Sequence, residues 1–163
     1  MAGSSGYIYR VLLTPTAQTA AKTLIQIKSG AAAIDIVSAR IYQITKATTE
    51  LLNVQLIQFT AAPTFGTVTS ATAAPLNGLD PAALAVGSTT ATGVNATAEP
   101  SGGTSVVQVE TYWNVLNGEW LYLPVPEQRI RIKQGGLGFT LKLNTAPAAS
   151  MTIGCYVDFI EYQ

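Results

Sequence analysis

The sequence has no histidine and a single cysteine among its 163 residues. Without histidine, the most common general base, the Ser-His-Asp and Cys-His arrangements and most zinc and iron sites are excluded. Cys155 cannot form a disulfide within the chain, and it alternates with Ile153 and Val157, which predicts a buried side chain instead of a nucleophile. We therefore expect no enzyme, no cofactor and no metal.

Charge is also scarce. Charged residues make up 11% of the chain, against roughly a quarter in ordinary soluble domains, and 9 basic residues balance 9 acidic ones. Nucleic-acid binding requires an excess of lysine and arginine, and a helix that lies on a membrane requires a basic face. We therefore expect neither nucleic acid nor a membrane as a partner. A neutral surface with few charges favours association with other proteins.

Long apolar runs are absent too. Residues 1–6 are small and polar, and Val11–Leu13 is too short for the core of a signal peptide, which predicts synthesis in the cytoplasm without one. No segment approaches the roughly 20 apolar residues of a membrane span.

What the chain does have is alternation with a period of two, which is typical of β-strands with one buried and one wet face. Trp113 shares the apolar side of its strand with Val107 and Val109, whereas Glu110 and Asp158 fall on polar sides. The clearest strands lie in the second half of the chain, at 107–113, 130–133, 139–143 and 151–159.

Two earlier segments change the side of their apolar residues partway along. In 34–44 the switch falls near Ile36-Val37, and in 52–60 it falls near Leu56-Ile57. Such a switch predicts a β-bulge or a strand that crosses between sheets.

Two glycine-containing turns separate predicted strands. Asn117-Gly118 predicts a two-residue hairpin between 111–116 and 119–123. Gly135-Gly136 predicts a hairpin turn as well, because the Lys-Ser/Thr ending and the following helix of a phosphate-binding loop are missing.

The segment 61–103 is rich in Ala, Thr, Gly and Pro and is too long for an ordinary connection. We expect a long surface loop with one short helix near 80–86, capped by Asp80 and started by Pro81. With about eight principal strands, the chain predicts a single all-β domain over 1–163. It would be an antiparallel β-sandwich of the jelly-roll type, with an immunoglobulin-like sandwich as the alternative.

Aromatic residues supply the candidate contacts. Tyr112, Trp120 and Tyr122 flank the Asn117-Gly118 turn and could form a platform against a sugar ring or a partner surface. The segment Tyr7, Ile8 and Tyr9 is apolar and suits a permanent interface.

Four stretches carry a resemblance: 20–27, Ala98-Glu99-Pro100, the aromatic segment up to Leu121–Pro124, and 138–162. They resemble small jelly-roll structural proteins of tailed bacteriophages, of the head decoration or cement type. The resemblance implies a non-enzymatic virion protein on the outer capsid surface, where it clamps neighbouring subunits and stiffens the shell. It also implies a homo-oligomer, a trimer in the first instance, with the major capsid protein as its partner. Residues 1–14, as an N-terminal arm, and the 61–103 loop would reach the neighbours.

Three alternatives remain open at this point. The chain could be a phage tail or fibre component, or a jelly-roll capsid subunit. It could also be a carbohydrate-binding module that uses Tyr112, Trp120 or Tyr122 as a stacking platform.

Overall fold

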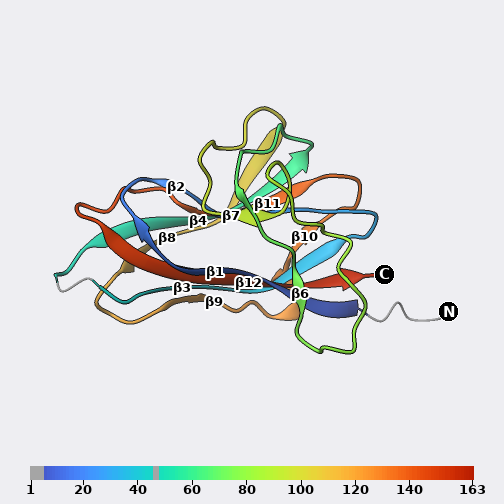
Figure 1. Ribbon diagram of the computed structural model, residues 1–163, viewed down its shortest axis with the longest axis horizontal. Coiled ribbons are helices and arrows are strands. Elements are labelled where there is room, and N and C mark those ends of the chain that lie inside the picture. Colours follow the sequence, from blue (N-terminus) through green and yellow to red (C-terminus); the bar gives the residue numbers. More distant parts are fainter. Residues whose placement is uncertain (1–5, 46–47) are drawn as a thin grey trace.

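The computed structural model describes residues 6–45 and 48–163. They form two antiparallel β-sheets that pack face to face as a sandwich (Figure 1). The predicted all-β sandwich is therefore confirmed. The only helix in the described ranges is the single 3-10 turn η1 (Pro126–Gln128).

Sheet A holds both ends of the described chain. Its strand order is β10-β3-β12-β1-β6, and β9 also pairs with β3. Its strands are β1 (Gly6–Gln18), β3 (Ile34–Gln43), β6 (Ala74–Pro75), β9 (Trp120–Tyr122), β10 (Ile130–Ile132) and β12 (Met151–Tyr162).

Sheet B packs against it with the order β5-β7-β2-β11-β4-β8. Its strands are β2 (Lys22–Lys28), β4 (Leu51–Ala61), β5 (Thr69–Ser70), β7 (Gly93–Val94), β8 (Thr104–Asn114) and β11 (Gly138–Leu143).

The core lies between the inner faces of the two sheets. The alternating apolar residues of β11 and β12 are buried there, as the two-residue period predicts. Cys155 is fully buried among them, and burial raises the pKa of its thiol above the ordinary value. Trp113 is buried too, and its indole Nε1 donates a hydrogen bond to the carbonyl of Gly118 at 2.9 Å.

Both positions at which the apolar residues were predicted to change sides of the strand coincide with β-bulges. Between β3 and β12 the register moves from Asp158 opposite Ser38 to Phe159 opposite Ile36, so Val37 has no partner. Between β4 and β8 the shift falls at Leu56/Ile57 as predicted. There the extra residue, Gln108, belongs to β8.

The hairpin predicted at Asn117-Gly118 is wrong. It joins β8 of sheet B to β9 of sheet A, so the flanking strands do not pair with each other. Gly135-Gly136 likewise leads from β10 in sheet A to β11 in sheet B. Gly118 and Gly136 do adopt the positive φ of tight turns, at 87° and 86°. A turn motif predicts that the chain reverses, but it does not predict which sheet the next strand joins.

The long segment 62–103 is ordered against both sheets, and the helix predicted near 80–86 is not formed. A six-residue helix has little stability of its own. Here the amides of Leu84 and Ala85 instead donate hydrogen bonds of 2.8 and 3.0 Å to the fully buried carboxylate of Glu161.

Two further predictions need correction. Of the predicted N-terminal arm, residues 1–5 lie outside the described ranges, and residues 6–14 are not an arm, because β1 pairs with β12 on one side and β6 on the other. Val107 is not in the core but 46% exposed, because the bulge at Gln108 places it on the opposite side of the strand from Val109.

Candidate interaction surface

The outer face of sheet A carries a set of arginine, tyrosine and aliphatic side chains. Cross-strand neighbours project on the same side of a sheet, so the strand register defines this set. Along one row, Leu12, Tyr156, Arg40 and Leu121 are successive partners across β1, β12, β3 and β9. We call the whole set the sheet A face: Ile8, Arg10, Leu12, Asp35, Ser38, Arg40, Tyr42, Leu121, Arg131, Tyr156, Asp158, Ile160 and Tyr162.

Near its centre, Asp158 is held by Arg10. The Arg10 guanidinium donates from Nε and Nη2 to the two carboxylate oxygens at 2.6 and 2.8 Å, and Ser38 donates a third hydrogen bond at 2.9 Å. Asp158 lies on the polar side of its strand as predicted, yet it is only 7% exposed. The guanidinium that neutralises it also lies over the ring of Tyr156, 3.9 Å from the ring centroid.

A second bidentate pair lies at the end of the face where the chain ends meet. Arg131 donates to both oxygens of Asp35 at 2.7 and 2.8 Å, and the Tyr162 hydroxyl donates to one of them at 2.7 Å. Burial alone would raise the pKa of Asp35, but the hydrogen bonds from Arg131 and Tyr162 outweigh it and hold this pKa below its ordinary value. The bond to Asp35 in turn raises the pKa of Tyr162.

The third arginine, Arg40, forms an ion pair with Glu119 and lies near two aromatic rings. Its guanidinium is 5.7 Å from the ring centroid of Tyr42 and 5.9 Å from that of Tyr156. Tyr42 covers Gly154, because a Cβ built on that glycine would lie 2.5 Å from the tyrosine hydroxyl oxygen. The missing side chain lets the tyrosine ring lie flat on the sheet.

This composition is similar to that of protein interfaces. The centres of such interfaces are enriched in Tyr and Arg and depleted of Lys, Glu and Asp. None of the six strands of sheet A contains a lysine, and the two aspartates of the face are covered by arginines. Each arginine is already paired with a carboxylate, Arg40 with Glu119 outside the set, so the charges of the face are neutralised within the molecule. The arrangement suits a partner that offers apolar and hydrogen-bonding groups in place of opposite charge.

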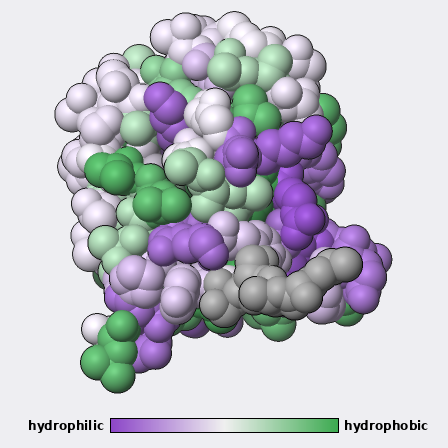
Figure 2. Space-filling model, turned by 90° about the vertical axis from the view of Figure 1, so that its right-hand side faces the viewer, coloured by the Kyte–Doolittle hydropathy of each residue, from purple (hydrophilic) through white to green (hydrophobic). Residues whose placement is uncertain are grey.

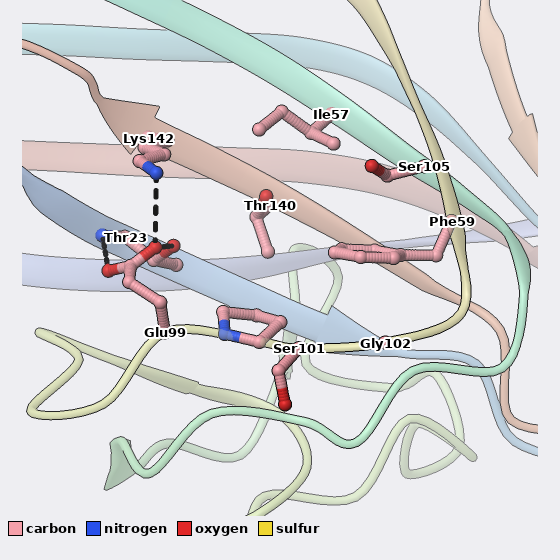
Figure 3. Close-up of a pocket in the computed structure, with 10 residues that line it drawn as sticks. Thr23, Ile57, Phe59, Glu99, Ser101, Gly102, Ser105, Thr140 and Lys142 are labelled. Carbon is pink, nitrogen blue, oxygen red and sulfur yellow. Dashed lines mark hydrogen bonds and ion pairs between the residues drawn. The ribbon is translucent and has the colours of Figure 1, made fainter.

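The outer face of sheet B differs, because the long segment covers part of it. The carboxylate of Glu99 accepts hydrogen bonds from the amide and the hydroxyl of Thr23, at 2.6 and 2.7 Å, and lies 3.5 Å from Lys142 Nζ (Figure 3). A depression of about 270 Å³ opens beside this anchor, with the ring of Phe59 along one side. Its charged groups, Glu99 and Lys142, are therefore engaged in holding the long segment on sheet B.

Figure 2 shows the end of the molecule near the two chain ends. The described residues there give a mostly pale surface, with purple gathered on one side and green in patches. The tight arginine–tyrosine set of the sheet A face remains the better candidate.

The residues predicted at the N-terminal contact site are divided between the core and the surface. Tyr9 is fully buried; its ring lies 5.7 Å from that of Phe159, and its hydroxyl donates to the carbonyl of Pro81 at 3.0 Å. Burial is the main cause of its raised pKa. Tyr7 packs against the core, and Ile8 points outward at 39% exposure. Ile8 alone of the three belongs to the sheet A face.

The predicted aromatic platform is not assembled. Tyr112 lies on the outer side of sheet B and is 68% exposed, whereas Trp120 and Tyr122 belong to sheet A and pack inward against the core. Three residues that are close in the sequence thus lie on different sheets.

Sequence reasoning missed the sheet A face. Its tyrosines and arginines do alternate with core residues in β3 and β12, so the strands themselves carried the signal. What was missing was the strand order, which brings β1 and β12 side by side although they lie at opposite ends of the chain.

Within the described ranges, no helix is long and apolar enough to cross a membrane. The same residues contain no cluster of three or more acidic or cysteine side chains placed to hold a metal ion. The chain matches no protein-family model, no curated protein and no solved structure.

Proposed function

We propose that this chain is a non-enzymatic structural protein of a virion, most specifically a decoration protein that binds the outer surface of a phage capsid and stabilises the shell. The observation that carries the proposal is the sheet A face. It combines tyrosine, arginine and aliphatic side chains, lacks lysine and has its charges neutralised within the molecule. The resemblance to small phage structural proteins supplies the class of assembly.

We also propose that the sandwich is a jelly roll. In support, strands from the two halves of the chain pair in nested order: β1 with β12, β2 with β11, β3 with the short strand β10, and β4 with β8, all antiparallel. A chain folded first into one long hairpin and then rolled up has this pairing, with its halves split between two sheets.

In this proposal the sheet A face rests on the capsid. Its arginines are held by carboxylates and rings, so little side-chain entropy is lost when a partner covers them. The partner would be the major capsid protein, contacted by apolar and hydrogen-bonding groups.

The first test is mass spectrometry of purified virus particles from the source of the sequence. We expect the protein in the particles, in a fixed ratio to the major capsid protein. Its complete absence from intact particles would overturn the proposal.

The second test assigns the face. Particles lacking the protein are incubated with purified wild type or with the variants Tyr156→Ala and Gln55→Ala, and bound protein is measured after sedimentation. Removing Tyr156 takes away the ring beneath Arg10 and should weaken binding about tenfold or more, as for interface hot spots. Gln55→Ala is the control, since Gln55 lies on the outer side of the other sheet, in β4, and it should bind like the wild type.

Equal loss in both variants would contradict the assignment of the face but not the presence of the protein on particles. A tail or fibre component is the remaining candidate within the same class. Electron cryomicroscopy separates the two, because a decoration protein adds density over the capsid and a tail component adds it only at the tail.

A further inference from the structure

Strand β8 leaves a long edge of this sandwich open. Among the described residues, the other sheet edges are covered by short strands: β5 and β6 have 2 residues each, and β9 and β10 have 3 each. β6 pairs with β1 only at Tyr9 and Arg10, so β1 is also uncovered beyond Arg10, but Pro15 and the bulge between Leu13 and Thr16 interrupt that stretch. β8 ends sheet B with 11 residues, and only β4 pairs with it. Short edge strands protect a sheet from edge-to-edge association, whereas a long open edge leaves its outward N–H and C=O groups without partners.

The usual protections are missing from β8. Its sequence, Thr104–Asn114, contains neither lysine nor proline, and its only charged residue is Glu110. Side chains along it are exposed, among them Val106, Val107 and Tyr112. Val, Thr, Tyr and Trp favour extended pairing.

One protection is present: the bulge at Gln108 disturbs the first part of the strand. The second part is regular, because Val109–Asn114 faces Leu51–Leu56 residue by residue. The pairing-competent edge is therefore this second part.

We propose that the β8 edge is an interface with a second copy of this chain, in which two β8 strands pair antiparallel about a two-fold axis. An antiparallel strand edge is complementary to itself, so the outward backbone groups of each copy bond to the other and neither β8 edge remains open. The chain has a net charge of zero, so two copies approach without repulsion.

The register of the two β8 strands follows from the direction and charge of their side chains. Residues opposite each other must project on the same side of the sheet, so the two-fold axis must pass through a residue and not between two residues. An axis at Glu110 would place the two Glu110 carboxylates opposite each other. An axis at Thr111 places Glu110 opposite Tyr112, Val109 opposite Trp113 and the two threonines opposite each other. This register avoids the like-charge contact and is the one we assign.

The two-fold pair goes beyond the proposed attachment to a capsid, because it uses sheet B and leaves the sheet A face free. It also competes with the trimer that the phage resemblance implies. The isolated protein tests it without particles, so its failure is distinguishable from failure of the capsid proposal.

The experiment is sedimentation equilibrium of the wild type and of the variants Tyr112→Glu and Tyr112→Lys, at low and high salt. We expect a wild-type dimer. Tyr112→Glu places a second carboxylate opposite Glu110 at both symmetric positions and should weaken the dimer about tenfold at low salt. Tyr112→Lys places an ammonium there and should dimerise at least as tightly as wild type.

The double variant Glu110→Lys/Tyr112→Glu restores opposite charges and should recover the dimer. Circular dichroism verifies that every variant is folded, which we expect because both side chains are on the exposed side of β8. A monomeric or trimeric wild type, or equal effects of Glu and Lys at position 112, would overturn the proposal.

Discussion

At the scale of single residues, the most distinctive feature is that acidic side chains on an outer sheet face are nearly buried. Asp35 and Asp158 are 5% and 7% exposed, and each is covered by an arginine that binds it through two hydrogen bonds. Such charge-assisted bidentate pairs have well-defined geometry. These pairs fix the arginine side chains on the sheet, so the guanidinium groups are not available to bind other carboxylates.

The lowered pKa of Asp35 makes stability depend on pH. A carboxyl group with a lower pKa in the folded than in the unfolded state stabilises the fold fully above the unfolded pKa, about 3.9. This contribution is lost as the pH falls through the folded-state pKa. Urea unfolding at pH 7 and at a pH near 2.5 should therefore show that Asp35→Asn destabilises the protein at pH 7 and much less in acid.

Glu110→Gln is the control, because Glu110 is exposed and accepts only amide hydrogen bonds from Asn53 and Gln55. It should change the free energy of unfolding by less than about 0.5 kcal/mol at either pH. An Asp35→Asn effect that is equal at both pH values would show that the ion pair with Arg131 does not stabilise the fold.

At the scale of elements, strand β2 shows how the long segment completes the sandwich. All five residues between its ends are buried, whereas a strand with one wet face exposes every second residue. Gln26, on the outer side, donates to the carbonyls of Gly66 and Ala91 at 3.3 and 2.5 Å and accepts from the amide of Gly66 at 3.1 Å. One buried amide thus ties two parts of the long segment to sheet B.

Replacing Gln26 by Leu should release this part of the segment. It leaves the backbone groups of Gly66 and Ala91 without their partner, which costs about 2–3 kcal/mol in unfolding free energy. Hydrogen exchange measured by mass spectrometry should become faster in 62–103 and stay unchanged in β12. Gln55→Leu is the matched control, because Gln55 makes a single exposed side-chain hydrogen bond to Glu110. Unchanged exchange in the Gln26 variant would contradict this anchoring role.

The elements also mark what sequence reasoning could reach. Local alternation predicted the strands around Phe139 and Cys155 and the two bulges, because these depend on neighbours along the chain. Two other features depend on residues far away in the sequence. The segment 80–86 binds Glu161 instead of forming the predicted helix, and Gln26 is buried where it binds Gly66. The candidate interface failed for the same reason: Tyr112 and Trp120 are sequence neighbours that belong to different sheets.

At the scale of the whole molecule, the two halves of the chain form a fold only together. Every strand pair of the described residues, except β1 with β6, joins a strand before Gly78 to one after it. Gly78 itself lies in open surroundings, since a Cβ added there would meet nothing. It therefore marks a natural place to divide the chain.

Fragments 1–78 and 79–163 should each lack stable β-structure, because neither contains the partners of its long strands. Mixed together, they should associate with a 1:1 ratio and recover the circular dichroism of the intact protein. Circular dichroism and sedimentation of each fragment and of the mixture measure this. A fragment that gives the native β-sheet signal alone would contradict the dependence of one half on the other.

The pairing of Gly6 with Tyr162 brings the two ends of the described chain side by side. Both ends of the described chain emerge at the same pole of the sandwich (Figure 1). The end of β8, which pairs with the start of β4, lies toward the opposite pole. A domain fused to either end would therefore be carried away from the β8 edge. In a two-fold pair the fused domains would point in opposite directions, so the protein could serve as a short rod that displays cargo at both tips.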